Sequence, residues 1–146
     1  MSTDRTFVER NRAATERIRT LATTLSDAAL QQAVGEHWTV AIALAHLAFW
    51  DRRVLAVLDE SEAAGRLSFP QIDFKVNDVS LPLWAAIPPR VAAQLALASA
   101  ETLDRRLESF PQELLDLLNA HSERWVLRAR HRNEHLDEVD AALNRR

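Results

Sequence analysis

The sequence predicts an all-α fold: a four-helix bundle with a long central crossover. Alanine, leucine, arginine and glutamate dominate the 146 residues and β-branched runs are scarce, a composition that favours helices. Apolar residues recur at helical spacing in four long segments, and an irregular stretch with two prolines separates the second from the third. Four long helices joined in this way are typical of a bundle. The length suits one hydrophobic core, so we expect a single domain over residues 1–146.

The first long helix is expected over residues 3–24, and a short helix follows it. Five apolar residues recur through the first segment at helical spacing: Phe7, Ala14, Ile18, Leu21 and Leu25. Ser26 and Asp27 then provide an N-cap for a short helix over residues 28–34. Gly35 is expected to end this helix, because glycine readily adopts conformations outside the helical region.

The second long helix is expected over residues 40–64, and the crossover follows it. Thr39 is a suitable N-cap, and Gly65 marks the end of the helix. Residues 66–84 contain two prolines and mix polar with apolar side chains. This pattern predicts an irregular crossover that includes at most a short extended piece. No stretch of the chain predicts a convincing strand.

One short and two long helices complete the predicted bundle. A pair of prolines can begin the third long helix, over residues 88–110, because proline is tolerated in the first helical turn. Residues 111–121 predict a short helix. The last long helix is expected over residues 122–146, with Ser122 as its cap.

Composition and charge exclude several classes of function. The net charge is −3 without a basic surplus, so nothing favours binding to nucleic acid. The chain has no cysteine, which excludes disulfides, thiolate metal ligands and a protein thiol nucleophile. Only two glycines occur, so Gly-rich phosphate loops are absent. No apolar run reaches membrane-spanning length and the first residues lack an apolar signal core; we therefore expect a cytoplasmic protein.

Two histidines lie four residues apart in the stretch HRNEH. At this spacing His131 and His135 share one face of the last helix, at the edge of its apolar stripe. The stripe consists of Trp125, Ala129, Leu136, Val139 and Leu143. Glu134 points away from His135, and the pattern is not the HExxH motif. Two imidazoles on one face can bind one metal ion, but a histidine pair on a charged helix can equally belong to a solvated face.

His46 lies among apolar residues on the second long helix. Its face also carries Ile42, Ala43, Trp50 and Val57. A buried imidazole needs a partner, because leaving it unpaired costs free energy. The partner could be a carbonyl or carboxylate, or a metal ion shared with His131 and His135. Three histidine ligands leave one coordination position open, which is typical of catalytic sites. Geometry alone leaves both interpretations open.

The remaining histidines and the tryptophans receive no functional role. His37 lies in a loop and His121 lies near the start of a helix, so both are expected to be surface or capping residues. The four tryptophans could line a pocket, although aromatic residues at helical spacing more often belong to the core. They are Trp38, Trp50, Trp84 and Trp125.

Two segments resemble the DinB/YfiT-like superfamily. HWTVAIALAHLAFWD (37–51) has a Trp-Thr entry into the second helix, then a leucine-rich stretch with a histidine, then an aromatic residue and an acid. HRNEHLDEVDAAL (131–143) is similar to the superfamily's last helix, in which HxxxH precedes a hydrophobic and an acidic residue. The resemblance covers nearly the whole chain. It implies a bundle with a long crossover that holds a divalent metal ion through His46, His131 and His135.

The resemblance also implies a function. Relatives include mycothiol-dependent maleylpyruvate isomerase and transferases of bacillithiol or other low-molecular-weight thiols, while others are recorded only as metal-dependent hydrolases or damage-inducible proteins. We therefore expect a metal-dependent thiol S-transferase. Zinc is the first choice of metal, before nickel, iron and manganese, and the thiol would be mycothiol, bacillithiol or glutathione. The alternatives are a hydrolase with metal-activated water and a non-catalytic, stress-related metal-binding protein.

Three further side chains are candidates for handling a substrate. Arg53 and Arg128 lie two turns from the histidines on their helices and could hold carboxylates of the thiol or the substrate. Glu138 lies one turn beyond His135 and could accept its hydrogen bond or act as a general base. All three could equally be exposed surface residues. We expect a small-molecule substrate, no nucleic-acid or membrane partner, and a homodimer formed through the first or third long helix.

Overall fold

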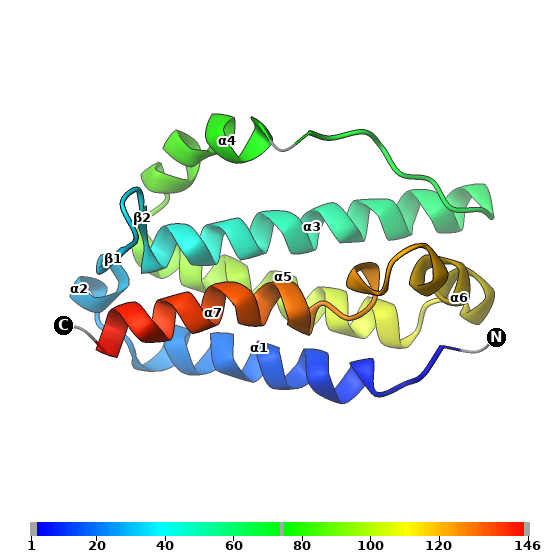
Figure 1. Ribbon diagram of the computed structural model, residues 1–146, viewed down its shortest axis with the longest axis horizontal. Helices are drawn as coiled ribbons and strands as arrows, with labels where there is room; N and C mark the ends of the chain where they lie inside the picture. The colour runs from blue at the N-terminus through cyan, green and yellow to red at the C-terminus, as the bar shows by residue number, and fades with distance from the viewer. Residues whose placement is uncertain (1–2, 74, 145–146) are drawn as a thin grey trace.

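The predicted all-α bundle with a long crossover is confirmed by the computed structural model, which describes residues 3–73 and 75–144. Four long helices lie side by side and form the bundle (Figure 1). They are α1 (Phe7–Thr24), α3 (Val40–Ala64), α5 (Pro89–Glu108) and α7 (Ala129–Asn144). Three shorter helices connect them in the described part of the chain: α2 (Asp27–Leu30), α4 (Lys75–Ala86) and α6 (Gln112–His121).

The crossover joins two parallel helices. In Figure 1, α3 and α5 run in the same direction, whereas α1 and α7 run in the opposite one. The chain must therefore return along the length of α3 before α5 can begin. The sequence predicted an irregular crossover over residues 66–84, which is wrong in part, because α4 forms within it. Pro82 lies inside α4 and removes one backbone donor, which explains why the sequence pattern concealed this helix.

A small β-hairpin corrects the prediction that the chain lacks strands. β1 (Ala33–Val34) pairs antiparallel with β2 (Trp38–Thr39). The helix expected over residues 28–34 accordingly ends early, since α2 stops at Leu30. Gly35 has φ 69° and supplies the left-handed conformation that the turn of the hairpin requires. The hairpin delivers Trp38 to the start of α3, which matters for the site.

The ends of α3 follow the sequence prediction. The side chain of Thr39 accepts a hydrogen bond from the backbone N–H of Ile42 at 3.1 Å, as an N-cap does. Gly65 adopts φ 69° after the last turn and its N–H bonds back to the Glu62 carbonyl, a common way to end a helix. These two residues set the length of the helix that carries His46.

The last helix begins later than predicted. The expected helix over residues 122–146 is interrupted, because a 3-10 helix, η1 (Glu123–Trp125), precedes α7. The Ser122 side chain accepts a bond from the Arg124 N–H and so caps η1 rather than the long helix. Trp125 consequently lies outside the apolar stripe of α7. Similarly, α1 begins at Phe7 rather than at residue 3.

The core consists of two main apolar clusters with a polar layer where they meet. One cluster contains Leu47 of α3 and Leu136 of α7. The other contains Val54 of α3 and Ala129 of α7. Each long helix contributes a buried polar side chain to the layer between the clusters. These side chains are Thr15, Asp51, Asp104 and Arg132.

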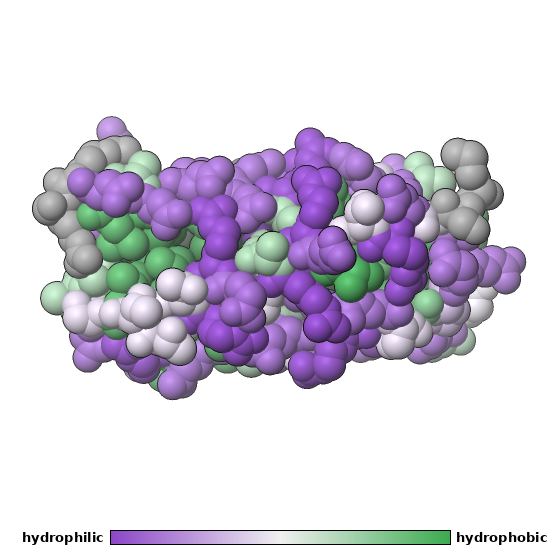
Figure 2. All heavy atoms as spheres, turned by 90° about the horizontal axis from the view of Figure 1, so that it is seen from below, coloured by the Kyte–Doolittle hydropathy of each residue, from purple (hydrophilic) through white to green (hydrophobic). Residues whose placement is uncertain are grey.

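The face of the bundle on the side of α1 is mostly polar. Figure 2 shows the α1 side, where hydrophilic side chains cover most of the face and apolar ones gather toward one end. No helix in the described ranges is both long and apolar enough to cross a membrane. The homodimer stays a prediction.

Candidate metal centre

Three histidines from two helices converge on one point. His46 projects from α3, and His131 and His135 project from α7. The Nε2 atoms of His46 and His131 are 3.3 Å apart, and the ring of His46 lies 4.5 Å from that of His135. One ring nitrogen from each residue lies within 4.8 Å of the others. The structure thus assembles the group of histidines that the sequence singled out.

The donor set fits a divalent ion. Zinc bound to nitrogen at 2.0–2.1 Å in tetrahedral geometry places two ligand nitrogens about 3.3 Å apart, and the His46–His131 pair has this separation. The Nδ1 atoms of His46 and His135 are buried and have no hydrogen-bond partner among the residues that the structure describes. Imidazole also suits nickel and iron, so the donor set alone does not select the metal.

All three imidazoles are held in the neutral form that a metal ligand requires. Burial, followed by the nearby His135 and Arg128, lowers the pKa of His46 to about 3. Burial and the adjacent Arg128 lower the pKa of His131 to about 2. Burial also lowers the pKa of His135, although Glu138 and Glu134 oppose this effect. The cluster therefore presents neutral nitrogen donors at pH 7.

These lowered pKa values predict that the metal-free protein loses stability in mild acid. In the unfolded chain His46 and His131 take up protons below pH 6.5, their ordinary pKa, while in the folded protein they stay neutral. The free energy of unfolding should then fall by about 1.4 kcal/mol per pH unit for each histidine. Urea titrations of chelator-treated, dialysed protein between pH 7 and 5 measure this slope. His131→Gln should make it shallower; an unchanged slope in that variant would contradict the assignment.

Arg128 holds His131 in place. It precedes α7, is buried, and its Nη2 lies 3.2 Å from His131 Nδ1. Its Nε donates to Asp51 Oδ1 at 3.2 Å. Because arginine is only a donor, His131 Nδ1 must accept, so the ring proton lies on Nε2, facing His46 Nε2. An ion bound at Nε2 would require this proton to move to Nδ1, where Arg128 offers no acceptor, so Arg128 Nη2 would have to turn away from the ring.

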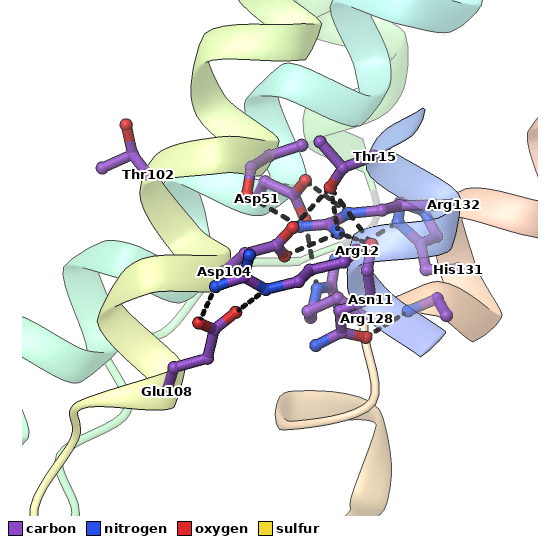
Figure 3. Close-up of polar contacts among 12 residues, drawn as sticks. Asn11, Arg12, Thr15, Asp51, Thr102, Asp104, Glu108, Arg128, His131 and Arg132 are labelled. Atoms are coloured by element: carbon purple, nitrogen blue, oxygen red, sulfur yellow. Dashed lines mark hydrogen bonds and ion pairs between the residues drawn. The ribbon is translucent and has the colours of Figure 1, made fainter. Parts of the chain in front are cut away.

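A buried ion-pair network lies directly behind Arg128. Arg132 Nε donates to Asp51 Oδ2 at 2.9 Å, and its Nη1 donates to Asp104 Oδ1 at 2.8 Å. Figure 3 shows the guanidinium of Arg132 between these carboxylates and Thr15. Burial alone would lower the pKa of Arg132, but Asp51 and Asp104 outweigh it and raise that pKa. Asp51 thus joins the network to Arg128 and, through it, to His131.

Sequence reasoning missed the role of this network. Arg132 lies within the stretch HRNEH and Asp51 ends the segment HWTVAIALAHLAFWD, but neither pattern assigned a role to these two residues. A signal was nevertheless present. Arg132 lies three residues after Ala129 and four before Leu136, which places it on the buried stripe of α7. A charged residue on such a stripe requires buried partners.

The other candidate residues lie at different places. Arg53 packs over the ring of Trp125, with its guanidinium carbon 5.7 Å from the ring centre. Glu138 Oε1 lies 3.7 Å from His135 Nδ1, too far for a hydrogen bond. His37 is exposed, and His121 is exposed and stacked on Phe69, so neither joins the cluster, as expected.

The histidines open into a cavity of about 390 Å³. Trp38 and Trp50 line it together with Asn77, Arg124 and Arg128. Trp50 Nε1 donates to Asn77 Oδ1 at 3.0 Å, and this bond ties α4 to α3 beside the opening. Two of the four tryptophans therefore line the pocket. Trp84 packs edge-on against His46, with the two ring centres 5.3 Å apart. Trp125 ends η1 and does not line this cavity.

One family model matches most of the chain. It is described as the mycothiol maleylpyruvate isomerase N-terminal domain and matches residues 11–142. The match includes all three clustered histidines and confirms the resemblance noted from the two motifs. No curated protein matches the chain, and no solved structure does.

Proposed function

The chain belongs to the mycothiol maleylpyruvate isomerase N-terminal domain family, and from this membership and the histidine cluster we propose that it is a metal-dependent thiol S-transferase. The observation that carries the proposal is a group of three neutral imidazoles at the wall of an open cavity. Three protein ligands leave one coordination position for an exogenous group, which is typical of catalytic rather than structural sites. We propose His46, His131 and His135 as the ligands and zinc as the metal, with nickel, iron and manganese as alternatives.

The chain's own residues would bind and orient the reactants. A divalent ion held by the histidines would lower the pKa of a thiol, which favours the nucleophilic thiolate at neutral pH. The sulfur must come from a small molecule, because the chain has no cysteine; mycothiol, bacillithiol and glutathione are the candidates. Trp38 and Trp50 provide apolar walls that exclude water from the reacting sulfur.

We propose that Arg128 and Glu138 orient histidine rings and do not bind the metal themselves. Arg128 is already paired with Asp51 and faces His131, so its role would be to orient that ring rather than to hold a substrate carboxylate. Glu138 Oε1, 3.7 Å from His135 Nδ1, would accept a hydrogen bond from His135 after a small rotation. A carboxylate acceptor of this kind fixes the orientation of a metal-bound histidine, whereas Arg128, as a donor, would orient only the metal-free ring.

The proposal predicts thiol-dependent turnover. Zinc-loaded protein, each candidate thiol and 1-chloro-2,4-dinitrobenzene would be mixed, and formation of the thioether followed by its absorbance. The expected result is a rate above the uncatalysed reaction for at least one thiol. This rate should fall to background in His131→Gln and persist in His121→Gln, whose histidine lies outside the cluster. Product formed by water instead of thiol would favour the hydrolase, and no product in either reaction would favour a non-catalytic metal protein.

A further inference from the structure

A second cavity lies along α3 beside the cavity at the histidines. The second cavity has a volume of about 380 Å³ and shares Trp50, Arg124 and Arg128 with the first. Its far wall is formed by Arg53 and Trp125. Since three residues line both cavities, the two are adjacent, and we call the pair of them the groove. The groove leads from the histidines at one end to Arg53 at the other.

Arg53 lies at a defined distance from the histidines. It follows His46 by seven residues on the same helix, so the two side chains leave α3 on nearly the same side, about 10 Å apart along its axis. Its Nη2 donates to the carbonyl of Pro70. Its Nη1 is buried and has no hydrogen-bond partner in residues 3–73 and 75–144. One face of the guanidinium is covered by the ring of Trp125.

Arg53 differs from the other arginines of the groove because those have carboxylate partners. Arg124 is paired with Glu134, and Arg128 is paired with Asp51. No carboxylate among the described residues lies within ion-pair distance of Arg53. Burial lowers the pKa of its guanidinium and outweighs the opposing effect of Glu60. A partly buried cation with a free donor and no counter-ion is poorly satisfied, and a planar carboxylate supplies both charge and acceptors.

We propose that Arg53 and Trp125 form a second binding subsite, which takes a carboxylate at the far end of the ligand whose reacting end lies at the histidines. Placing the reacting end at the histidines rests on the function proposed above, whereas the carboxylate subsite does not depend on that function. The ligand class is an elongated molecule with a carboxylate about 10 Å from its reacting atom. The rings of Trp50 and Trp125 would pack against its apolar middle part.

The test uses the full chain in its metal-free form, so that it does not depend on the metal or on turnover. The protein would be titrated with 3-phenylpropionate and with its neutral analogue 3-phenylpropan-1-ol, and binding followed by tryptophan fluorescence and calorimetry. The acid should bind more tightly than the alcohol by about tenfold, the effect of one charge-assisted contact. Equal affinity for acid and alcohol would overturn the proposal.

Two variants and a control locate the effect. Arg53→Gln should abolish the preference for the acid, while Arg53→Lys, which keeps the charge but not the planar fork, should retain part of it. Arg66→Gln removes the same charge from an exposed position just after α3 and should leave the preference unchanged. If Arg53→Gln still bound the acid more tightly than the alcohol, the subsite would be contradicted. If Arg53→Gln did not fold, an undiminished preference for the acid in Arg53→Lys would contradict it instead. Because no metal is present, this outcome is independent of the thiol-transfer assay.

Discussion

Replacing Arg132 by methionine is expected to lower the free energy of unfolding by about 3–5 kcal/mol. Arg132 is fully buried and bridges Asp51 and Asp104 at 2.9 and 2.8 Å. Methionine fills a similar volume but leaves the buried Asp104 without a cation and Asp51 with Arg128 alone. Asp104 must then protonate or draw in water. Urea unfolding at pH 7, in the absence of metal, measures the loss.

Arg130 provides a matched control for this prediction. It lies on the same helix, is exposed, and pairs with Glu123 at the surface. Arg130→Met should change the free energy of unfolding by no more than about 1 kcal/mol, because surface ion pairs contribute little. Adding Asp104→Asn to Arg132→Met should restore part of the stability, because the unpaired charge of Asp104 is then removed while Asp51 stays paired with Arg128. Equal losses in Arg132→Met and Arg130→Met would show that the buried network is not a source of stability.

Removing one histidine of the cluster is expected to abolish stoichiometric metal binding. Wild-type protein should carry about one equivalent of zinc after reconstitution and dialysis, whereas His46→Ala and His131→Ala should each carry almost none. The reason is that two imidazoles cannot hold the ion against dialysis, and affinity should fall by more than about 100-fold. Elemental mass spectrometry of the purified proteins measures the bound metal directly.

Two further variants separate ligation from general damage. His121→Ala removes an exposed histidine outside the cluster and should keep the full equivalent of zinc. Arg128→Met removes a cation and a hydrogen-bond donor that face His131 Nδ1; neither favours a bound cation, so this variant should keep about one equivalent of zinc. Wild-type protein that binds neither zinc nor nickel, iron or manganese would rule out the proposed enzyme.

Much of the fold was predictable because the signals are local. The apolar spacing of α1 and α3, the Thr39 cap and the Gly65 end all depend on residues within a turn or two of one another. The spacing of His131 and His135 on one helix face follows from helix geometry alone. By contrast, α4 was missed because Pro82 resembles a helix breaker, and the hairpin was missed because its strands have two residues each.

The sequence by itself determined the class of the fold and the approximate course of the long helices. Helix periodicity placed His131 and His135 on one face, and the resemblance to the DinB/YfiT-like superfamily added His46 to them. Only the tertiary structure decided what meets those faces across the bundle. It buries Arg132 between carboxylates from α3 and α5, and brings no carboxylate of the described residues within ion-pair distance of Arg53. The sequence does not reveal which residues pair with a charged side chain, because helix packing brings the partners together from distant positions along the chain.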